Sequence, residues 1–560
     1  MMNPKPATRP IGFWKRWIYT TDHRTIGIHY LLLSLLAVTA GTLLSIVMRI
    51  HMVWPKWILP FWGEILPENY LAVMTLHGTL MIFFVVTLVP QSSFANLVLP
   101  EQIGARAMAL PRLNAAALWI TGLALAILLA SILSPGGGPI SGWTSYPPLS
   151  VFPTAGPGQA SGMDFWLISI AVLAIASVMS ATNVLSTVIT KRCVGMTLGR
   201  MPLTVWSWMV TSILVMAAFS VLFVAIVMLL ADRHFGASFF VPPVDVIAGQ
   251  VFHRGNGSPM MWLHLFWFFG HPAIYVGILP GMGLISGVLA NFSRTPPLGY
   301  RWMVGSTLLI GVLGLVVWGH HMFASGMNPY ADTAFALTTM AIAIPSTVKV
   351  LSWLGTIWRG KRERTTAMLF ALGFVSLFVT GGLTGPVLAQ PMLDRYLHNT
   401  YFVVAHFHLI MSMAGIFSIY AGIYYWFPLM SGRLMNEALG KWHFWLTLVG
   451  AYATFLPMHL VGLFGQPRQY EQLVGDYVLF QNLAPLEKLI TCAAIVLAAA
   501  QLIFLCNFLW SMKRGASAPI NPWRATTLEW KATQEEPIVY CGPYEYGVRG
   551  GNMNFRMQCE

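Results

Sequence analysis

Residues 401–412, YFVVAHFHLIMS, place His406 and His408 in an otherwise apolar run with a single Phe between them. Ionisable side chains inside a membrane helix are costly and usually serve a function. Side chains two residues apart on an α-helix differ in direction by ~200°, so these imidazoles point to opposite faces and cannot readily bind the same ion. The spacing therefore favours two large planar cofactors, two haems, one on each side of this helix.

The composition of the chain is that of a membrane protein. Its 560 residues are 56% hydrophobic and only 9% charged, whereas soluble proteins average about 25% charged residues. Apolar runs of about 18 or more residues recur along it, and each is long enough to cross a bilayer as a helix. We predict an all-α polytopic membrane protein. Its twelve expected transmembrane helices are centred near residues 40, 82, 124, 175, 218, 273, 313, 345, 376, 413, 453 and 499.

The formal net charge of +13 would also suit a nucleic-acid-binding protein. Lys and Arg are concentrated, however, in the gaps between helices that share a side with the N-terminus, which is the positive-inside pattern of membrane topology. We therefore expect both termini in the cytoplasm and no nucleic-acid partner. Residues 1–512 are predicted to form one membrane domain and residues 513–560 a polar cytoplasmic tail. The loop 135–163 contains no Lys or Arg and is expected outside.

Six histidines are predicted to lie at one depth. Helix directions and a rise of ~1.5 Å per residue place them together in the outer half of the bilayer. A lone membrane histidine is often a packed side chain bonded to a carbonyl, but six at one level indicate a metal centre. They are contributed by four helices, as His77, His271, the pair His320 and His321, and the pair His406 and His408.

The spacing also divides these histidines between cofactors. His77 can complete the coordination of one haem together with His408, which gives a six-coordinate, low-spin, electron-transfer centre. The haem on His406 would keep an open coordination position. We expect that position to face the remaining three histidines.

Those remaining histidines are His271, His320 and His321. Three neutral imidazoles suit copper or zinc, and the residues alone leave this choice open. Tyr275 lies four residues after His271 and hence on the same helix face. A phenol beside a histidine-bound redox metal can supply an electron and a proton.

Lys349 is the one lysine that lies far from both predicted membrane faces. A charged residue at that depth costs roughly 2.5–3.5 kcal/mol on insertion scales. Ser346 shares its helix face, and Thr339 lies further toward the metal layer. We predict a proton relay from the cytoplasm along these residues to Tyr275.

Several long motifs in one order resemble subunit I of the haem–copper oxygen reductases, most closely the A-type oxidases. The resemblance spans nearly the whole chain. The motifs are TTDHRTIGIHYL, LHGTLMIFF, WFFGHPAIY, WGHHMFASGM, IPSTVKVLSW, YFVVAHFHLIMSMAG and TTLEW. By position, the resemblance implies low-spin haem ligands His77 and His408, high-spin haem ligand His406, copper ligands His271, His320 and His321, and a covalent bond between Tyr275 and His271.

Further residues take roles through the resemblance alone. Arg49 matches an arginine that contacts a substituent of the low-spin haem, and Arg468 one of two arginines that hold haem propionates; the second is Gln469 here. His398 matches a magnesium ligand whose usual Asp neighbour is Asn399. The implied cofactors are two haems, haem A with haem B as the alternative, one copper and a magnesium.

The resemblance implies four-electron reduction of O2 to water, coupled to proton translocation through the Lys349 route, the family's K-type pathway. A second family pathway lacks its acids: Ala273 replaces a membrane Glu and Ala107 an entrance Asp, while Asn96 and Asn114 resemble remnants of that channel. We expect that the Lys349 route carries both chemical and pumped protons, or that pumping is weakened.

Two other functions fit the sequence less well. A nitric oxide reductase of the same superfamily would lack Tyr275 and Lys349, and a secondary transporter would not need six histidines in one layer. The five cysteines form neither a CxxC nor a CxxCH motif, which excludes c-type haem attachment. Electrons should therefore enter through a partner, oxidase subunit II, with subunit III also expected and cytochrome c or quinol as donor. We expect a bacterial cytoplasmic membrane, with the mitochondrial inner membrane as the alternative.

Overall fold

The computed structural model describes residues 14–58, 63–247, 250–252, 255–361, 363–471 and 477–530. Eleven helical segments in these ranges are long and apolar enough to span a membrane. The first six are α1 (His23–Val53), the segment Pro67–Gln102, the segment Pro111–Leu133, α5 (Ser161–Thr190), α6 (Leu203–His234) and α7 (Pro259–Ser293). The other five are Pro329–Arg359, α11 (Thr366–Leu388), Tyr401–Ser431, α15 (Glu437–Leu463) and α18 (Ala484–Arg514).

Several of these segments change helix type along their length. The composite segments consist of α2 (Pro67–Thr79), η2 (Leu80–Val86), η3 (Val89–Ser93) and α3 (Phe94–Gln102); α4 (Pro111–Ala130) and η4 (Ser131–Leu133); α9 (Pro329–Ala341) and α10 (Ala343–Arg359); and α13 (Tyr401–Phe407), η7 (His408–Met413) and α14 (Ala414–Ser431). Short elements between or beyond the spans are η1 (Trp14–Ile18), η5 (Leu198–Arg200), α12 (Pro391–Leu397), α17 (Val478–Gln481), η8 (Leu528–Trp530) and the antiparallel hairpin of β1 (Asp245–Ile247) and β2 (Gln250–Phe252).

The helical membrane architecture is thus confirmed, and the short hairpin is an addition that the sequence did not suggest. The predicted helix near residue 313 forms α8 (Tyr300–Gly314), which is too short to be counted with the eleven. After α8 the chain tightens into the 3₁₀ helix η6 (Trp318–Met322). The count of twelve and the cytoplasmic position of the termini remain predictions.

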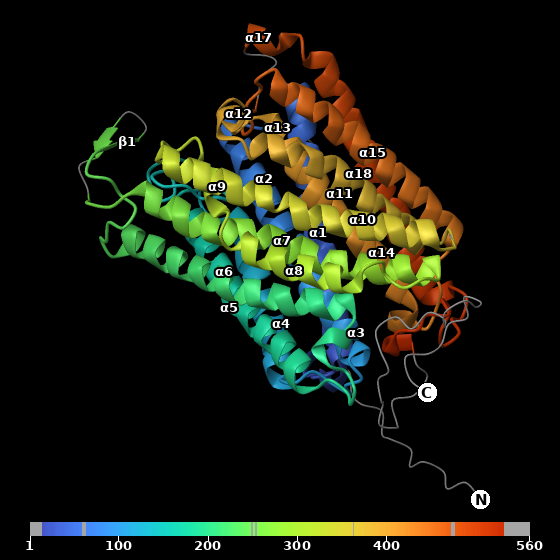
Figure 1. Cartoon of the computed structure of the whole chain (residues 1–560). Helices are drawn as coiled ribbons and strands as arrows, with labels where there is room; N and C mark the ends of the chain where they lie inside the picture. Colours follow the sequence, from blue (N-terminus) through green and yellow to red (C-terminus); the bar gives the residue numbers. More distant parts are fainter. Residues whose placement is uncertain are drawn as a thin grey trace, which may run out of the picture.

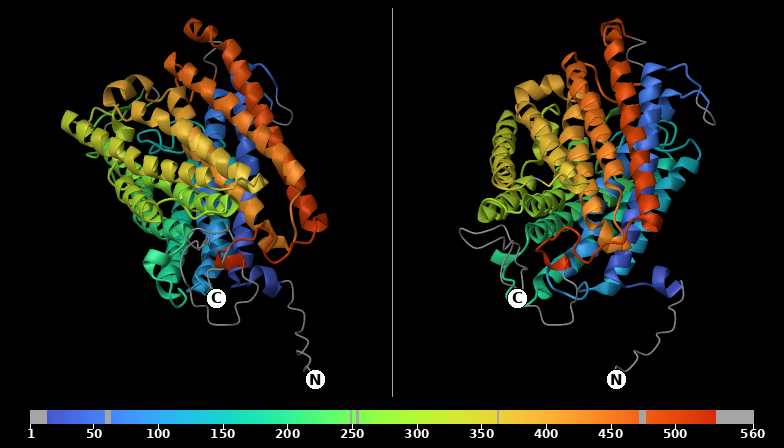
Figure 2. Two further views of the ribbon diagram at one scale, coloured as in Figure 1. Left: turned by 45° about the vertical axis from the view of Figure 1, so that its right-hand side comes forward. Right: turned by 90° about the vertical axis from the view of Figure 1, so that its right-hand side faces the viewer.

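The helices stack side by side along one common direction (Figure 1), with α6 packed between α5 and α7 and α15 packed on α18. In Figure 2, α18 stands at one edge of the bundle beside α1 and α15. The labels α12, α17 and β1 gather at one end of the molecule and α3 at the other. We call the first the outer end and the second the inner end, following the predicted topology.

The segment after α18 packs onto the inner end of the bundle. Ser517 pairs with Arg433 in an isolated bridge, and Trp530 is buried with its indole N–H donating to the Tyr425 hydroxyl at 3.1 Å. Helix α18 ends at Arg514. The domain boundary at residue 512 stays a prediction. The described part of the tail has no core of its own and uses that of the membrane domain.

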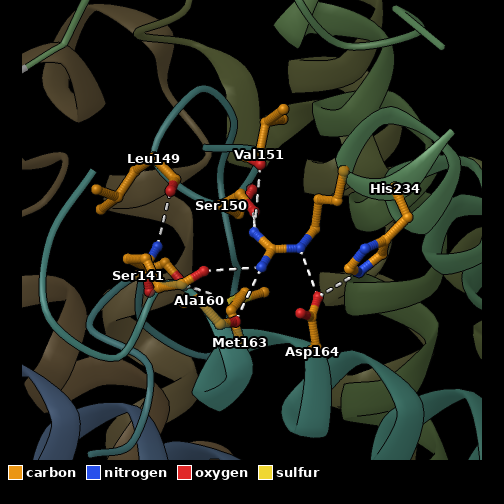
Figure 3. A network of polar contacts seen from close by, with 10 residues as sticks. Ser141, Leu149, Ser150, Val151, Ala160, Met163, Asp164 and His234 are labelled. Carbon is orange, nitrogen blue, oxygen red and sulfur yellow. Dashed lines mark hydrogen bonds and ion pairs between the residues drawn. The ribbon is translucent and has the colours of Figure 1, made fainter. Parts of the chain in front are cut away.

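A buried arginine at the end of α6 holds the outer loop (Figure 3). The Arg233 side chain is 0% exposed and its Nε donates to Asp164 at 2.7 Å. Its two terminal nitrogens donate to four backbone carbonyls, those of Ser150, Val151, Gln159 and Ala160. The N–H groups of this guanidinium are therefore positioned to bond the loop and Asp164 in the first turn of α5.

Replacing Arg233 by Met is expected to destabilise the protein by about 3–5 kcal/mol, because it leaves a carboxylate and four carbonyls without their buried donor. Thermal unfolding in detergent measures the loss, and limited proteolysis should show cleavage within residues 134–160. Arg301→Met, at an exposed position of α8, is the control. Equal unfolding temperatures for the two variants would contradict a clamp at Arg233.

Candidate metal centre

Three of the predicted histidines form a compact cluster. His271 comes from the middle of α7, and His320 and His321 come from η6, packed against it. One ring nitrogen from each lies within 4.8 Å of the others, which is close enough to hold one metal ion. His271 Nε2 is buried and has no hydrogen-bond partner among the described residues. His271 Nδ1 faces His321 Nε2 at 3.3 Å, and two imidazole nitrogens that face each other at this distance fit ligands of one metal ion.

Neighbouring side chains orient the cluster. His320 Nδ1 lies 3.1 Å from the Thr339 hydroxyl, whose own proton is donated to the Phe335 carbonyl. His320 Nδ1–H is therefore the donor, and its Nε2 lone pair stays free for a metal. The His321 ring stacks on Trp267 at a centroid distance of 3.9 Å. Such partners fix the tautomer and the ring orientation of metal-bound histidines.

Tyr275 lies against the cluster as predicted. Its ring centroid is 4.9 Å from that of His271, one helical turn away on α7. The end of α8 makes room for it: a Cβ on Gly314 would lie 2.9 Å from Tyr275 Cδ2. The absence of a side chain at Gly314 thus lets the tyrosine stay on the face of His271.

The pair His406 and His408 point to different neighbours. His406 Nδ1 lies 3.0 Å from the Gly381 carbonyl and 2.8 Å from the Thr384 hydroxyl, both on α11. His408 begins the π-helix η7 and stacks on Phe455 of α15 at a centroid distance of 4.7 Å. The two imidazoles therefore leave helix α13 in different directions, as their spacing predicts.

The Nδ1 atoms of these histidines and of His77 all lie next to backbone carbonyls. His77 Nδ1 is 2.8 Å from the Gly41 carbonyl, and His408 Nδ1 is 2.8 Å from that of Val404. Each Nδ1 must carry its proton to donate to a carbonyl, so each Nε2 presents a lone pair. His408 lies close enough to His77, and His320 to His406, to interact electrostatically. The donor set therefore fits two haem irons and one further metal ion.

Lys349 is 2% exposed and is held from a neighbouring helix. Its Nζ donates to the Thr307 hydroxyl at 2.7 Å, and the Met303 carbonyl lies 3.5 Å away. Ser346 lies one turn along α10, half-buried. Thr339, the third residue of the predicted relay, contacts His320 and so lies at the metal cluster.

Arg49 lies deep between α1 and α18 and already has protein partners. One terminal nitrogen donates to the carboxylate of Glu487 and, at 2.9 Å, to the Thr491 hydroxyl. Glu487 also accepts a bond from Gln466 at 2.9 Å. The positive charge that the resemblance assigns to a haem substituent is therefore balanced by a buried carboxylate of the chain.

The outer residues form a second polar group. Arg468 donates to the Asn399 side chain through Nε at 3.1 Å and Nη2 at 2.8 Å. His398 Nδ1 lies 3.0 Å from the Asp394 carboxylate one turn earlier. Asn399, which stands at the expected Asp position, thus serves to hold Arg468.

The positions of the missing acids are apolar in three dimensions as well. Ala273 is buried on α7, and Phe269, one turn earlier, stacks on Phe83 at a centroid distance of 5.6 Å. Asn114 donates its side-chain amide to that of Asn96. The two asparagines are therefore bonded to each other, and packed aromatic rings occupy the level at which a membrane carboxyl was sought.

Four residues that contact the predicted groups were not found from the sequence. Thr307 holds Lys349, Trp267 stacks on His321, Thr384 bonds His406, and Glu487 pairs with Arg49. All four contacts join different helices. Only Glu487 carried a signal, since a carboxylate inside an apolar helix is costly and needs a partner.

Comparisons with known proteins agree with this geometry. The family described as "Cytochrome C and Quinol oxidase polypeptide I" matches residues 25–496. The alternative cytochrome c oxidase subunit 1 of Bradyrhizobium diazoefficiens is 40% identical over 556 residues, 98% of this chain and 93% of that protein. Cytochrome c oxidase subunit 1 of Synechocystis sp. is 41% identical over 553 residues, 97% of this chain and 95% of that protein. A haem–copper terminal oxidase dimer solved by cryo-electron microscopy shares the fold, with a TM-score of 0.71 and 17% identity over 92% of this chain and 86% of its own.

Proposed function

The chain belongs to the family of cytochrome c and quinol oxidase polypeptide I, and from this premise we propose that it is the catalytic subunit of a terminal respiratory oxidase. It is a haem–copper oxidoreductase that reduces O2 to water and couples this reaction to movement of protons and charge across the membrane. The observation that carries the proposal is the cluster of His271, His320 and His321, with Tyr275 on one side and His406 within electrostatic reach of His320.

The chain's residues would divide the work as follows. His77 and His408 hold one haem, His406 the other, and the three-histidine cluster holds copper. When bound, these groups supply the electrons that O2 takes up. Tyr275 holds a proton next to His271, at the place where oxygen is reduced, and the covalent bond to His271 expected from the resemblance would fix its ring there.

Lys349 would bring protons to this site from the inner side. Thr307 fixes its Nζ within the membrane, and Thr339 lies at the metal cluster, so the relay residues occupy both ends of the route. With Ala273 and Ala107 in place of acids, this route would carry the protons that the reduction of oxygen consumes.

The wider assembly follows from the same premise. We place twelve helices in the membrane, counting α8 with η6, and both termini on the cytoplasmic side. The membrane would be a bacterial cytoplasmic membrane, with subunit II bringing electrons from cytochrome c or quinol, and subunit III as a further partner. The haems would be haem A, with haem B as the alternative, and His398 with Asp394 offers a site for magnesium.

The site residues argue against the two alternatives, a nitric oxide reductase and a transporter. Tyr275 and Lys349 are both present and buried against partners, which a nitric oxide reductase would not need. A transporter would not need three histidine nitrogens gathered within 4.8 Å of one another. The family match itself favours oxygen as the substrate.

The test is turnover by the purified complex in liposomes. We expect haem and copper in a ratio of two to one, oxygen consumption with an artificial electron donor, and acidification of the outer solution beyond the protons consumed. Oxygen consumption without proton ejection would mean that the enzyme separates charge by chemistry alone. A preparation with metals but no oxygen consumption would overturn the oxidase assignment.

Gly314→Ala tests the placement of Tyr275. The new methyl group would lie 2.9 Å from the tyrosine ring, and overpacking of this kind typically costs about 1–3 kcal/mol. We expect lower turnover, normal metal content, and a reduced yield of the peptide in which Tyr275 and His271 are joined, measured by mass spectrometry. Gly305→Ala, on the same helix with nothing within 4 Å of its added Cβ, should behave as wild type; equal effects of the two changes would contradict the argument.

A further inference from the structure

A small polar cavity lies at the inner end of the bundle, away from the metal cluster. It has a volume of about 10 Å³, which is room for one water molecule. Four helices and the segment after α18 surround it. The polar side chains that line it include Gln102 of α3, Thr204 of α6, Asn291 of α7 and Glu529 of η8.

Two of these side chains are buried with unmet hydrogen-bonding capacity. Asn291 is 2% exposed, and neither its amide nitrogen nor its amide oxygen has a partner among the described residues. Glu529 is 5% exposed, and its Oε2 is likewise unpaired within the described chain. A buried amide must normally both donate and accept. A water molecule between the two side chains would satisfy both.

Glu529 lies in surroundings that favour its neutral form. Its Oε1 accepts a bond from Gln102 Nε2 at 3.0 Å. Burial, with the carboxylate of Glu101 nearby, raises its pKa to about 6. The Glu529 carboxyl can therefore bind and release a proton closer to neutral pH than a carboxyl in water does.

The charged side chains near Glu529 are engaged with other partners. Glu101 of α3 is paired with Arg24 of α1. Arg294, at the end of α7, is engaged by Glu363 and by two carbonyls of the tail segment. The face of α6 contributes only a hydroxyl, and α14 contributes the phenol of Tyr425. Glu529 thus has no cation as a direct partner among the described residues.

From the cavity a row of hydroxyls runs into the membrane on α6. Thr204 donates to Gln102 Oε1 at 2.6 Å. Ser207 and Thr211 follow at helical spacing on the same face; both are buried, and Ser207 donates to the Thr204 backbone carbonyl at 2.7 Å. Thr211 Oγ1 has no partner in the described structure. Beside it, Gln91 donates to Ser212 at 2.9 Å and keeps an unpaired oxygen.

We propose that this cavity is a proton-binding site, in which Glu529 and the Asn291 amide share one water molecule, and that it loads protons onto the hydroxyl row of α6. The unpaired groups along that row mark further positions for water, up to Gln91. The site supplies a buried carboxyl at the inner end of a chain that has Ala107 and Ala273 at the positions where the resemblance implies acids. The inference rests on the proposed function, because the protons it collects are those that the oxidase consumes or moves.

The test uses infrared titration and proton uptake of the whole complex. In the resting complex, the infrared band of a protonated carboxyl should titrate near pH 6. The band should disappear in Glu529→Gln. It should change frequency in Asn291→Leu, because this variant keeps the carboxyl but removes the second partner of the water. The control Glu363→Gln, a more exposed inner-end carboxyl, should keep the band. During oxygen turnover in vesicles above pH 7, Glu529→Gln and Asn291→Leu should slow inner-side proton uptake several-fold, with unchanged haem and copper content.

Two results would overturn the proposal. One is the absence of any band that Glu529→Gln removes. The other is wild-type proton uptake in both cavity variants, which would leave the Lys349 route as the sole entry. The infrared titration does not depend on oxygen turnover. A complex that consumes no oxygen would therefore contradict the proposed function, while its carboxyl band would still test the proton-binding site. If Glu529→Gln fails to assemble, Asn291→Leu decides between the outcomes.

Discussion

Oxygen turnover by the Lys349→Met variant is expected to fall by about 10²-fold or more, the range that a positioned proton-transfer group contributes. Met keeps the length and apolar stem of the side chain but cannot carry a proton. It removes the group that donates to Thr307 across the interface of α10 and α8. Steady-state oxygen consumption by the purified complex measures the effect, with optical spectra to verify both haems.

Matched variants separate proton transfer from folding. Lys441→Met, at an exposed position of α15, should retain wild-type turnover. Thr307→Val keeps the lysine but removes its partner, so we expect a smaller loss together with a shift in the pH dependence of turnover. Substantial turnover in Lys349→Met would show that protons reach Tyr275 by another route. The cavity at Glu529 is the candidate entry for that route.

His320→Asn is expected to remove copper and abolish oxygen reduction while both haems remain. Three nitrogens of the described residues lie together in the cluster, so losing one leaves two, and a site with an incomplete ligand set binds its metal far more weakly. Metal analysis of the purified complex, alongside haem spectra, measures both quantities.

His443→Asn is the control for that experiment. His443 is also a buried histidine, but it bonds Tyr424 and Gln501 on neighbouring helices and has no place in the cluster. Its replacement should leave one copper per chain. Copper retention in His320→Asn would mean that the metal is held elsewhere, and loss of the haems in the same variant would mean that η6 had unfolded.

The common depth of the six histidines stays a prediction from the sequence. The helical membrane class and the burial of Lys349 both followed from the sequence. They did so because a bilayer imposes a single axis: the position of His77, His271 or Lys349 along an apolar run gives its depth at a known rise per residue. The opposite directions of His406 and His408 followed from the angular spacing within one helix. These are properties of individual helices, and they need no knowledge of which helix lies beside which.

Contacts between helices were decided by the tertiary structure alone. Thr307 holds Lys349, Trp267 stacks on His321, Gly314 leaves space for Tyr275, and Glu487 balances Arg49. Each contact depends on the rotation and neighbours of two helices, which apolar composition does not specify because lipid and protein faces are similarly apolar. For the same reason the sequence did not indicate the cavity at Asn291 and Glu529: the Glu529 carboxyl becomes buried only where the segment after α18 packs against the bundle.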